Sequence, residues 1–126
     1  MENFGVTNLT KGKLPSLPFA MMKTAILGKG YSLSLVFINK KKSLELNKTY
    51  RQKDKPANVL SFPYSKKDGE IFICIEVAKT QAKEYDKTWT EFVGFLVIHG
   101  MLHLKGMQHG STMEVQERKF SKKFSC

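Results

Sequence analysis

Apolar and polar residues alternate in several short segments of the chain, as they do in β-strands. The clearest segment is Tyr31 to Ile38, whose apolar side chains on both sides predict a strand covered on at least one face. Three further strands are expected at Phe4 to Leu9, Val59 to Phe62 and Glu70 to Ile75. The turn signal Lys67 to Gly69 predicts a hairpin between the last two. Pro63 should end the third strand or confine it to a sheet edge, because proline has no N–H to donate.

Helical spacing of apolar residues marks the segments between and after these strands. Pro15 and Pro18 precede a helix in which Phe19, Met22, Ala25 and Ile26 recur up to Gly28, as on an amphipathic helix laid on a sheet. Asn39 is a good N-cap for a second helix, which carries Leu44, Leu46 and Tyr50. A third helix is expected from Val77 to about Lys87.

Two more helices are predicted in the last third of the chain. Thr88 or Thr90 can cap a helix that is apolar on nearly every side, so this helix should be buried at the domain centre. Ser111 or Thr112 starts a terminal helix, and we expect the tail after Lys122 to be frayed. The chain is thus predicted to be one α+β domain, residues 1–126, with a small mixed sheet of about four strands and helices around it.

Composition indicates the cell compartment in which the protein acts. No apolar run approaches the roughly 20 residues that a membrane span needs, and no secretory signal is recognisable at the N-terminus. The two cysteines, Cys74 and Cys126, do not resemble a disulfide framework, and Cys74 is expected to be a buried thiol rather than a metal ligand. These features favour a cytoplasmic protein with no membrane partner.

Charge points to a polyanionic partner. The formal net charge is +10, and the segment from Asn39 to Lys67 holds nine Lys or Arg against two acids, hence seven of the ten net positive charges. Such a segment favours nucleic acid binding, although a plain lysine-rich soluble surface has a similar composition.

All three histidines of the protein fall within eleven residues, from His99 to His109. His99 and His103 are four apart, so on a helix their rings project from one face about one turn apart. Gly106 lies where a helix can end in a left-handed residue and return the chain, which brings in His109. Three neutral imidazoles and a water form an open, catalytic type of Zn²⁺ site, so we expect one zinc ion per chain.

The same spacing, H-x-x-x-H-x-x-G-x-x-H, is that of the zinc ligands in metzincin peptidases. Those peptidases carry their general-base Glu directly after the first histidine, where this chain has Gly100. A metallopeptidase therefore remains an alternative, but a disfavoured one.

Two separated motifs together resemble the YbeY family of bacterial endoribonucleases. They are the histidine segment His99 to His109 and Asn58-Val-Leu-Ser-Phe-Pro63, the latter preceded by Leu46-Asn-Lys-Thr-Tyr-Arg51. Asp68 to Cys74 matches the family's acidic-glycine hairpin region more loosely, and the likeness extends over roughly residues 31 to 120. The resemblance implies a zinc-dependent endoribonuclease that acts on single-stranded RNA. Its implied roles are 3′-end processing of small-subunit ribosomal RNA and ribosome quality control, with ribosomal particles as partners.

The resemblance also implies roles for individual residues. His99, His103 and His109 would be the zinc ligands. The candidate catalytic residues are Arg51, which matches the family's arginine that faces the metal, and Ser61, which lies in the strand that borders the active cleft. Arginine suits a phosphate because its planar guanidinium can donate two parallel hydrogen bonds.

The chain departs from the family at two positions where an acid is usual. Asn58 replaces the Asp before Val-Leu-Ser-Phe-Pro, and Gln108 replaces the Asp before the third histidine. Either acid could orient a ligand imidazole, so their loss puts ligand tuning and rate in doubt more than metal binding. A non-catalytic ribosome-assembly factor with structural zinc is therefore a further alternative. The group that acts as general base is left unassigned.

Overall fold

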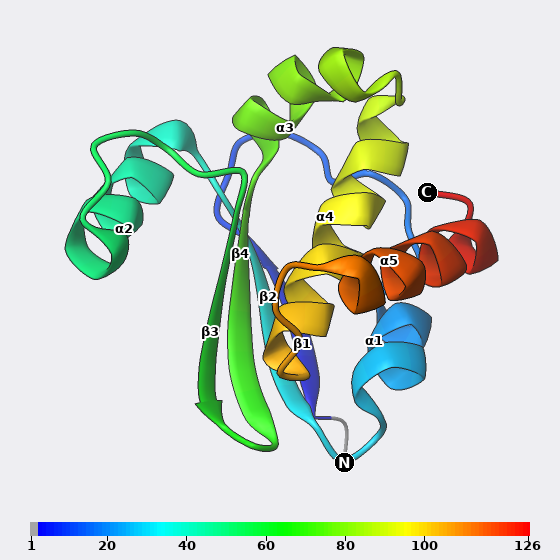
Figure 1. The fold of residues 1–126 in the computed structure, drawn as a ribbon. Coiled ribbons are helices and arrows are strands. Elements are labelled where there is room, and N and C mark those ends of the chain that lie inside the picture. The colour runs from blue at the N-terminus through cyan, green and yellow to red at the C-terminus, as the bar shows by residue number, and fades with distance from the viewer. Residues whose placement is uncertain (1–2) are drawn as a thin grey trace.

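The chain folds as a four-stranded sheet with helices on both faces, and the computed structural model describes residues 3–126 (Figure 1). In chain order the elements of this range are β1 (Phe4–Asn8), α1 (Phe19–Leu27), β2 (Ser32–Ile38), α2 (Lys40–Arg51), β3 (Val59–Ser65), β4 (Asp68–Cys74), α3 (Ile75–Ala82), a 3-10 turn (Lys83–Tyr85), α4 (Trp89–Leu104) and α5 (Ser111–Phe124). The predicted α+β architecture is confirmed.

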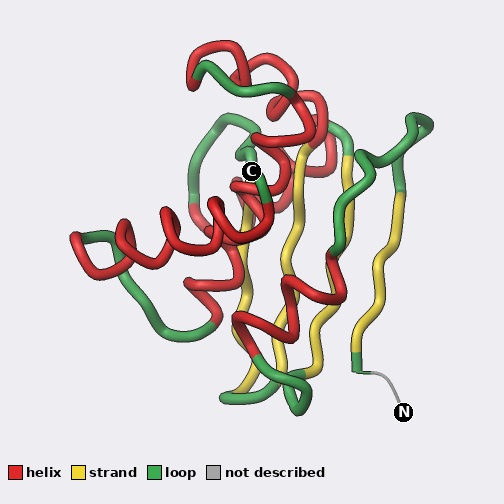
Figure 2. The backbone as a smooth tube through the Cα atoms, turned by 90° about the vertical axis from the view of Figure 1, so that its right-hand side faces the viewer, coloured by secondary structure: helices red, strands yellow, loops and turns green. Residues whose placement is uncertain are grey.

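The sheet is mixed, with strand order β1-β2-β4-β3. The first three strands of this order are parallel, and β3 pairs antiparallel with β4 as the predicted hairpin. Helices α1, α4 and α5 lie together on one face, whereas α2 lies on the other side of the sheet (Figure 1, Figure 2). Helix α3 follows β4 directly and lies across that end of the sheet (Figure 1).

Strand β2 shows how the apolar pattern becomes the core. Leu33, Leu35 and Phe37 enter the main core between the sheet and helices α1, α4 and α5. Val36 and Ile38 enter a smaller cluster on the opposite face, under α2 and α3. The strand is therefore buried on both faces from Leu35 to Ile38, where its apolar residues are consecutive, whereas the sequence predicted cover on at least one face.

Helix α4 is the central element of the fold. Thr88 caps it, because its side chain accepts from the Glu91 N–H while the Glu91 carboxylate accepts from the Thr88 N–H. Almost all its apolar residues are buried in the main core, which accounts for a helix with so little polar surface. Within residues 3–126, no helix has both the length and the apolar character needed to cross a membrane.

The hairpin differs in detail from the sequence expectation. The turn itself is formed by Lys66 and Lys67, and β3 continues past Pro63 to Ser65. Pro63 is tolerated inside the strand because β3 is an edge strand of the sheet. Gly69 is paired within β4 instead of turning the chain, and its backbone approaches the side chains of α4 and Tyr31 closely.

Gly69→Ala should destabilise the protein. A Cβ at this buried position would lie 2.5 Å from the Tyr31 hydroxyl and 2.9 Å from a Leu104 methyl, so the core would have to shift. We expect the free energy of unfolding to fall by about 1–3 kcal/mol. Chemical denaturation measures it, with Gly5→Ala as control, because a Cβ at Gly5 in β1 meets nothing within 4 Å. Equal stability of the two variants would contradict the close packing at Gly69.

The expectation of a frayed tail after Lys122 is wrong. Helix α5 continues to Phe124, and the Cys126 N–H then donates to the Ser121 carbonyl at 2.8 Å. The Cys126 side chain is buried against Gly94 of α4. Lys87 Nζ also donates to the Cys126 main-chain oxygen at 3.1 Å. This end of the chain is fixed by core packing, which a polar local sequence does not reveal.

Candidate metal centre

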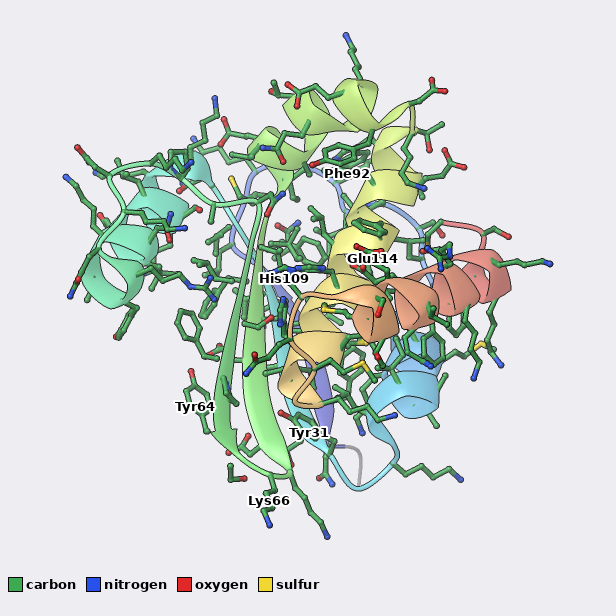
Figure 3. All side chains as sticks on the ribbon, viewed as in Figure 1. Tyr31, Tyr64, Lys66, Phe92, His109 and Glu114 are labelled. Atoms are coloured by element: carbon green, nitrogen blue, oxygen red, sulfur yellow. The ribbon has the colours of Figure 1, made fainter. Side chains whose placement is uncertain are left out.

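Three histidines converge at the end of α4. His99 and His103 lie on its last turns, and Gly106, with φ of +100°, ends the helix in a left-handed residue. The Gly106 N–H donates to the His103 carbonyl and the Met107 N–H to the Leu102 carbonyl, the pairing of a Schellman motif. The chain therefore turns back, and His109 lies in the space between α4 and the β3–β4 hairpin (Figure 3). One ring nitrogen from each of the three histidines lies within 4.8 Å of the other two.

Hydrogen bonds on the far side of two rings fix where their protons lie. His99 Nδ1 is 2.7 Å from Glu117 Oε2, and His103 Nδ1 is 3.0 Å from the Met107 carbonyl oxygen. A carboxylate and a carbonyl only accept hydrogen bonds, so each Nδ1 carries the hydrogen. When such a ring is neutral, its Nε2 presents a lone pair, and the two Nε2 atoms face each other at 3.1 Å.

This arrangement fits a bound cation. Burial, and then the neighbouring His99, lower the pKa of His103, which favours the neutral ring with its lone pair. Two lone pairs at this distance repel unless a positive charge lies between them. Tetrahedral zinc with Zn–N bonds of about 2.05 Å places its ligand nitrogens about 3.3 Å apart. The His99–His103 separation is close to that value, so the donor set is suitable for zinc.

The three histidines line one side of a cavity of about 700 Å³. The same cavity is also lined by cationic residues from the end of α2 and the segment after it, namely Arg51, Lys53 and Lys55. Arg51 is close enough that its charge contributes to lowering the pKa of His103. The metal candidates and the predicted phosphate-binding arginine therefore share one cavity, as the sequence analysis expected.

Buried polar residues of α2 hold in place the segment that follows the helix and carries Lys53 and Lys55. Ser43 Oγ accepts from the Ala57 N–H at 2.8 Å and donates to the Ala57 carbonyl at 2.7 Å. Asn47 Nδ2 donates to the Lys55 carbonyl at 2.7 Å. These bonds tie residues 52–58 to the helix, and the left-handed residue Gln52 ends α2 directly after Arg51. The apolar residues named for this helix from the sequence contribute less to its packing, because Leu44 and Leu46 are only partly buried and Tyr50 is exposed.

Ser61 connects this cavity to α4. It lines the cavity, and its Oγ donates to the Gly100 carbonyl at 3.1 Å. A Cβ at Gly100 would lie 3.0 Å from Ser61 Oγ and 3.1 Å from an Ile71 methyl. Position 100 thus faces the packed sheet and has no room for the Glu of a zinc peptidase, which argues against the metallopeptidase alternative.

Asn58 and Gln108, which stand where the family usually has an acid, differ in their surroundings. Asn58 donates to Gln81 Oε1 of α3 at 2.8 Å, and Gln108 lines the cavity beside His109. The carboxylate that contacts a histidine comes instead from Glu117 on α5. Sequence reasoning missed this role, because no spacing rule relates His99 to a residue 18 positions later on another helix. Cys74 is buried on the opposite sheet face, and burial raises the pKa of its thiol.

Known proteins resemble the chain over most of its length. The family model described as Endoribonuclease YbeY matches residues 13–124. The Endoribonuclease YbeY of Colwellia psychrerythraea is 46% identical over 94 residues, which are 69% of this chain and 61% of the relative. That of Acholeplasma laidlawii is 42% identical over 90 residues, covering 68% of this chain and 66% of the relative. The chain thus spans less than two thirds of the length of these curated relatives.

A solved structure shares the fold. A protein of Thermotoga maritima, determined in solution, superposes with a TM-score of 0.67 at 26% identity, over 93% of this chain and 85% of that one. The sequence match spans all three histidines, Arg51 and Ser61, and the structural match extends over nearly the whole chain. The chain belongs to the YbeY family.

Proposed function

We propose that the chain is a zinc-dependent endoribonuclease that cleaves single-stranded RNA. One observation carries the proposal: three histidines with converging nitrogens and three cationic side chains line the same cavity. Membership of the YbeY family, whose relatives are named endoribonucleases, supports the reaction class. We further propose that the substrate is the 3′ end of small-subunit ribosomal RNA on ribosomal particles, in maturation and quality control in the cytoplasm. The net charge of +10 supports a polyanionic partner.

Each group in the cavity then has a defined task. His99, His103 and His109 would hold the zinc ion. When bound, zinc supplies Lewis-acid stabilisation of phosphoryl charge and lowers the pKa of water. Arg51 donates paired hydrogen bonds to phosphate oxygens, and Lys53 and Lys55 neutralise neighbouring phosphates of the strand. Ser61 fixes the edge strand β3 against α4, so the cavity keeps its width.

Position 100 supplies no carboxylate to accept the proton, because the residue there is glycine. It is also packed against the sheet. Either a water or the 2′-hydroxyl of the RNA is the nucleophile. A substrate with a single 2′-deoxy nucleotide at the cleaved position separates these routes, since only attack by the 2′-hydroxyl requires that oxygen.

Metal removal tests the proposed function. A labelled single-stranded RNA that spans the 3′ end of small-subunit ribosomal RNA is incubated with the purified protein before chelation, after it, and after reloading. We expect chelation to abolish cleavage and one equivalent of zinc to restore it, with the same sequence in a duplex cut far more slowly. Cleavage that survives chelation contradicts the proposal. A zinc-loaded protein that binds ribosomal particles but cuts no RNA would instead support the assembly-factor alternative.

A further inference from the structure

Glu117 is the one carboxylate among residues 3–126 that contacts a histidine of the cluster. Its Oε2 lies 2.7 Å from His99 Nδ1, on the side of the ring opposite the converging nitrogens. Both side chains are largely shielded, with 19% of the His99 side chain and 13% of the Glu117 side chain exposed. In the same described range, no Lys or Arg nitrogen lies within 4.0 Å of this carboxylate. Its hydrogen-bonding capacity is therefore directed at the imidazole.

The position of Glu117 on α5 explains how it is held. Met113 and Phe120, four residues before it and three after it, are buried in the main core. These spacings place all three side chains on one face of the helix, the face that packs against α4. A carboxylate on the core-facing stripe of a helix is costly unless it is paired. Core packing on both sides thus fixes the carboxylate beside His99.

We infer that Glu117 is a positioning residue that orients His99 for metal binding. Its carboxylate holds the hydrogen on Nδ1 and directs the Nε2 lone pair into the cluster. It also makes the ring a stronger electron-pair donor to the metal. It would supply the carboxylate–histidine interaction that Gln108, the residue beside His109, cannot provide with a charge. The inference deepens the proposed function and rests on its metal site. It assigns α5 a part in metal affinity, although α5 provides no ligand of its own.

Zinc affinity of substituted proteins tests the inference. Glu117→Ala removes the acceptor, whereas Glu117→Gln keeps an oxygen that can accept from Nδ1 but removes the charge. Competition with a chromophoric chelator should show zinc binding weakened about 10–100-fold in Glu117→Ala and by a smaller factor in Glu117→Gln. Glu114→Ala, an exposed glutamate on the same helix (Figure 3), should stay within about twofold of wild type. Thermal unfolding of the zinc-free variants verifies that they fold.

A second readout needs no metal and would not change if Glu117 only stabilised the fold. In nitrogen-15 spectra of the zinc-free protein, His99 should carry its hydrogen on Nδ1, and Glu117→Ala should shift the ring towards a mixture of tautomers. A hydrogen on Nε2 of His99 in wild type overturns the inference. So does equal zinc affinity of wild type, Glu117→Ala and Glu117→Gln. A wild type that binds no zinc contradicts the proposed function itself, so the two failures are distinguishable.

Discussion

His103→Ala should yield a folded protein that neither retains zinc nor cleaves RNA. The centroid of its ring is 4.5 Å from that of His99 and 4.8 Å from that of His109, so its loss removes one of the three converging imidazoles. Changing a residue that merely supports a ligand costs about 10–100-fold in metal affinity, and loss of a ligand should exceed that. We therefore expect zinc affinity to fall more than about 100-fold and single-turnover cleavage to fall to background.

Lys105→Ala serves as the control for this variant. Lys105 is exposed at the end of α4, two residues after His103, and contributes no cluster nitrogen. The Lys105→Ala variant should bind one zinc ion and cleave RNA at close to the wild-type rate. Wild-type cleavage by His103→Ala would remove the histidine cluster from the reaction.

Arg51→Ala should have the second largest effect, and a different one. The variant keeps all three histidines, so its zinc content should match wild type. Loss of a preorganised donor to charge that develops in a transition state costs about 10²–10³ in rate, and we expect a decrease of that order in single-turnover cleavage. Arg51→Lys should recover only part of it, because an ammonium cannot make the paired contact.

Lys53→Ala is the matched comparison for Arg51. Lys53 lines the same cavity and carries the same charge. Its ammonium, however, would act on the RNA phosphates only as a point charge. Its loss should mainly weaken RNA binding and reduce the salt dependence of that binding by about one phosphate contact. If Arg51→Ala cuts as fast as wild type, or behaves only as Lys53→Ala does, the specific phosphate role of Arg51 is wrong.

The sequence was sufficient for features that depend on local pattern. The strand β2, the N-cap Asn39, the hairpin and a threonine cap of α4 all follow from residue spacing and turn chemistry, and of the two threonines considered for that cap, Thr88 forms it. The meeting of three histidines was also predictable, because a helical repeat and a left-handed Gly106 fix their relative positions within eleven residues.

The features that were missed depend on contacts between distant segments. Glu117 reads as an ordinary helix acid until α5 is packed on α4. The polar residues Ser43 and Asn47 were not among the predicted apolar residues of α2, yet both are buried and form hydrogen bonds to the loop after their own helix. Cys126 reads as part of a polar tail until its thiol meets Gly94. In each case tertiary packing decides, and local propensity carries no signal of it.

X-ray absorption at the zinc edge tests the central claim most directly, since it measures the ligands of the metal in the reloaded wild-type protein. The histidine cluster predicts one zinc ion per chain with three imidazole nitrogens at about 2.0–2.1 Å and one further light-atom ligand. His103→Ala should lose this signal. Zinc held by sulfur at about 2.3 Å, from Cys74 or Cys126, or a wild-type protein that retains no zinc, would contradict the claim.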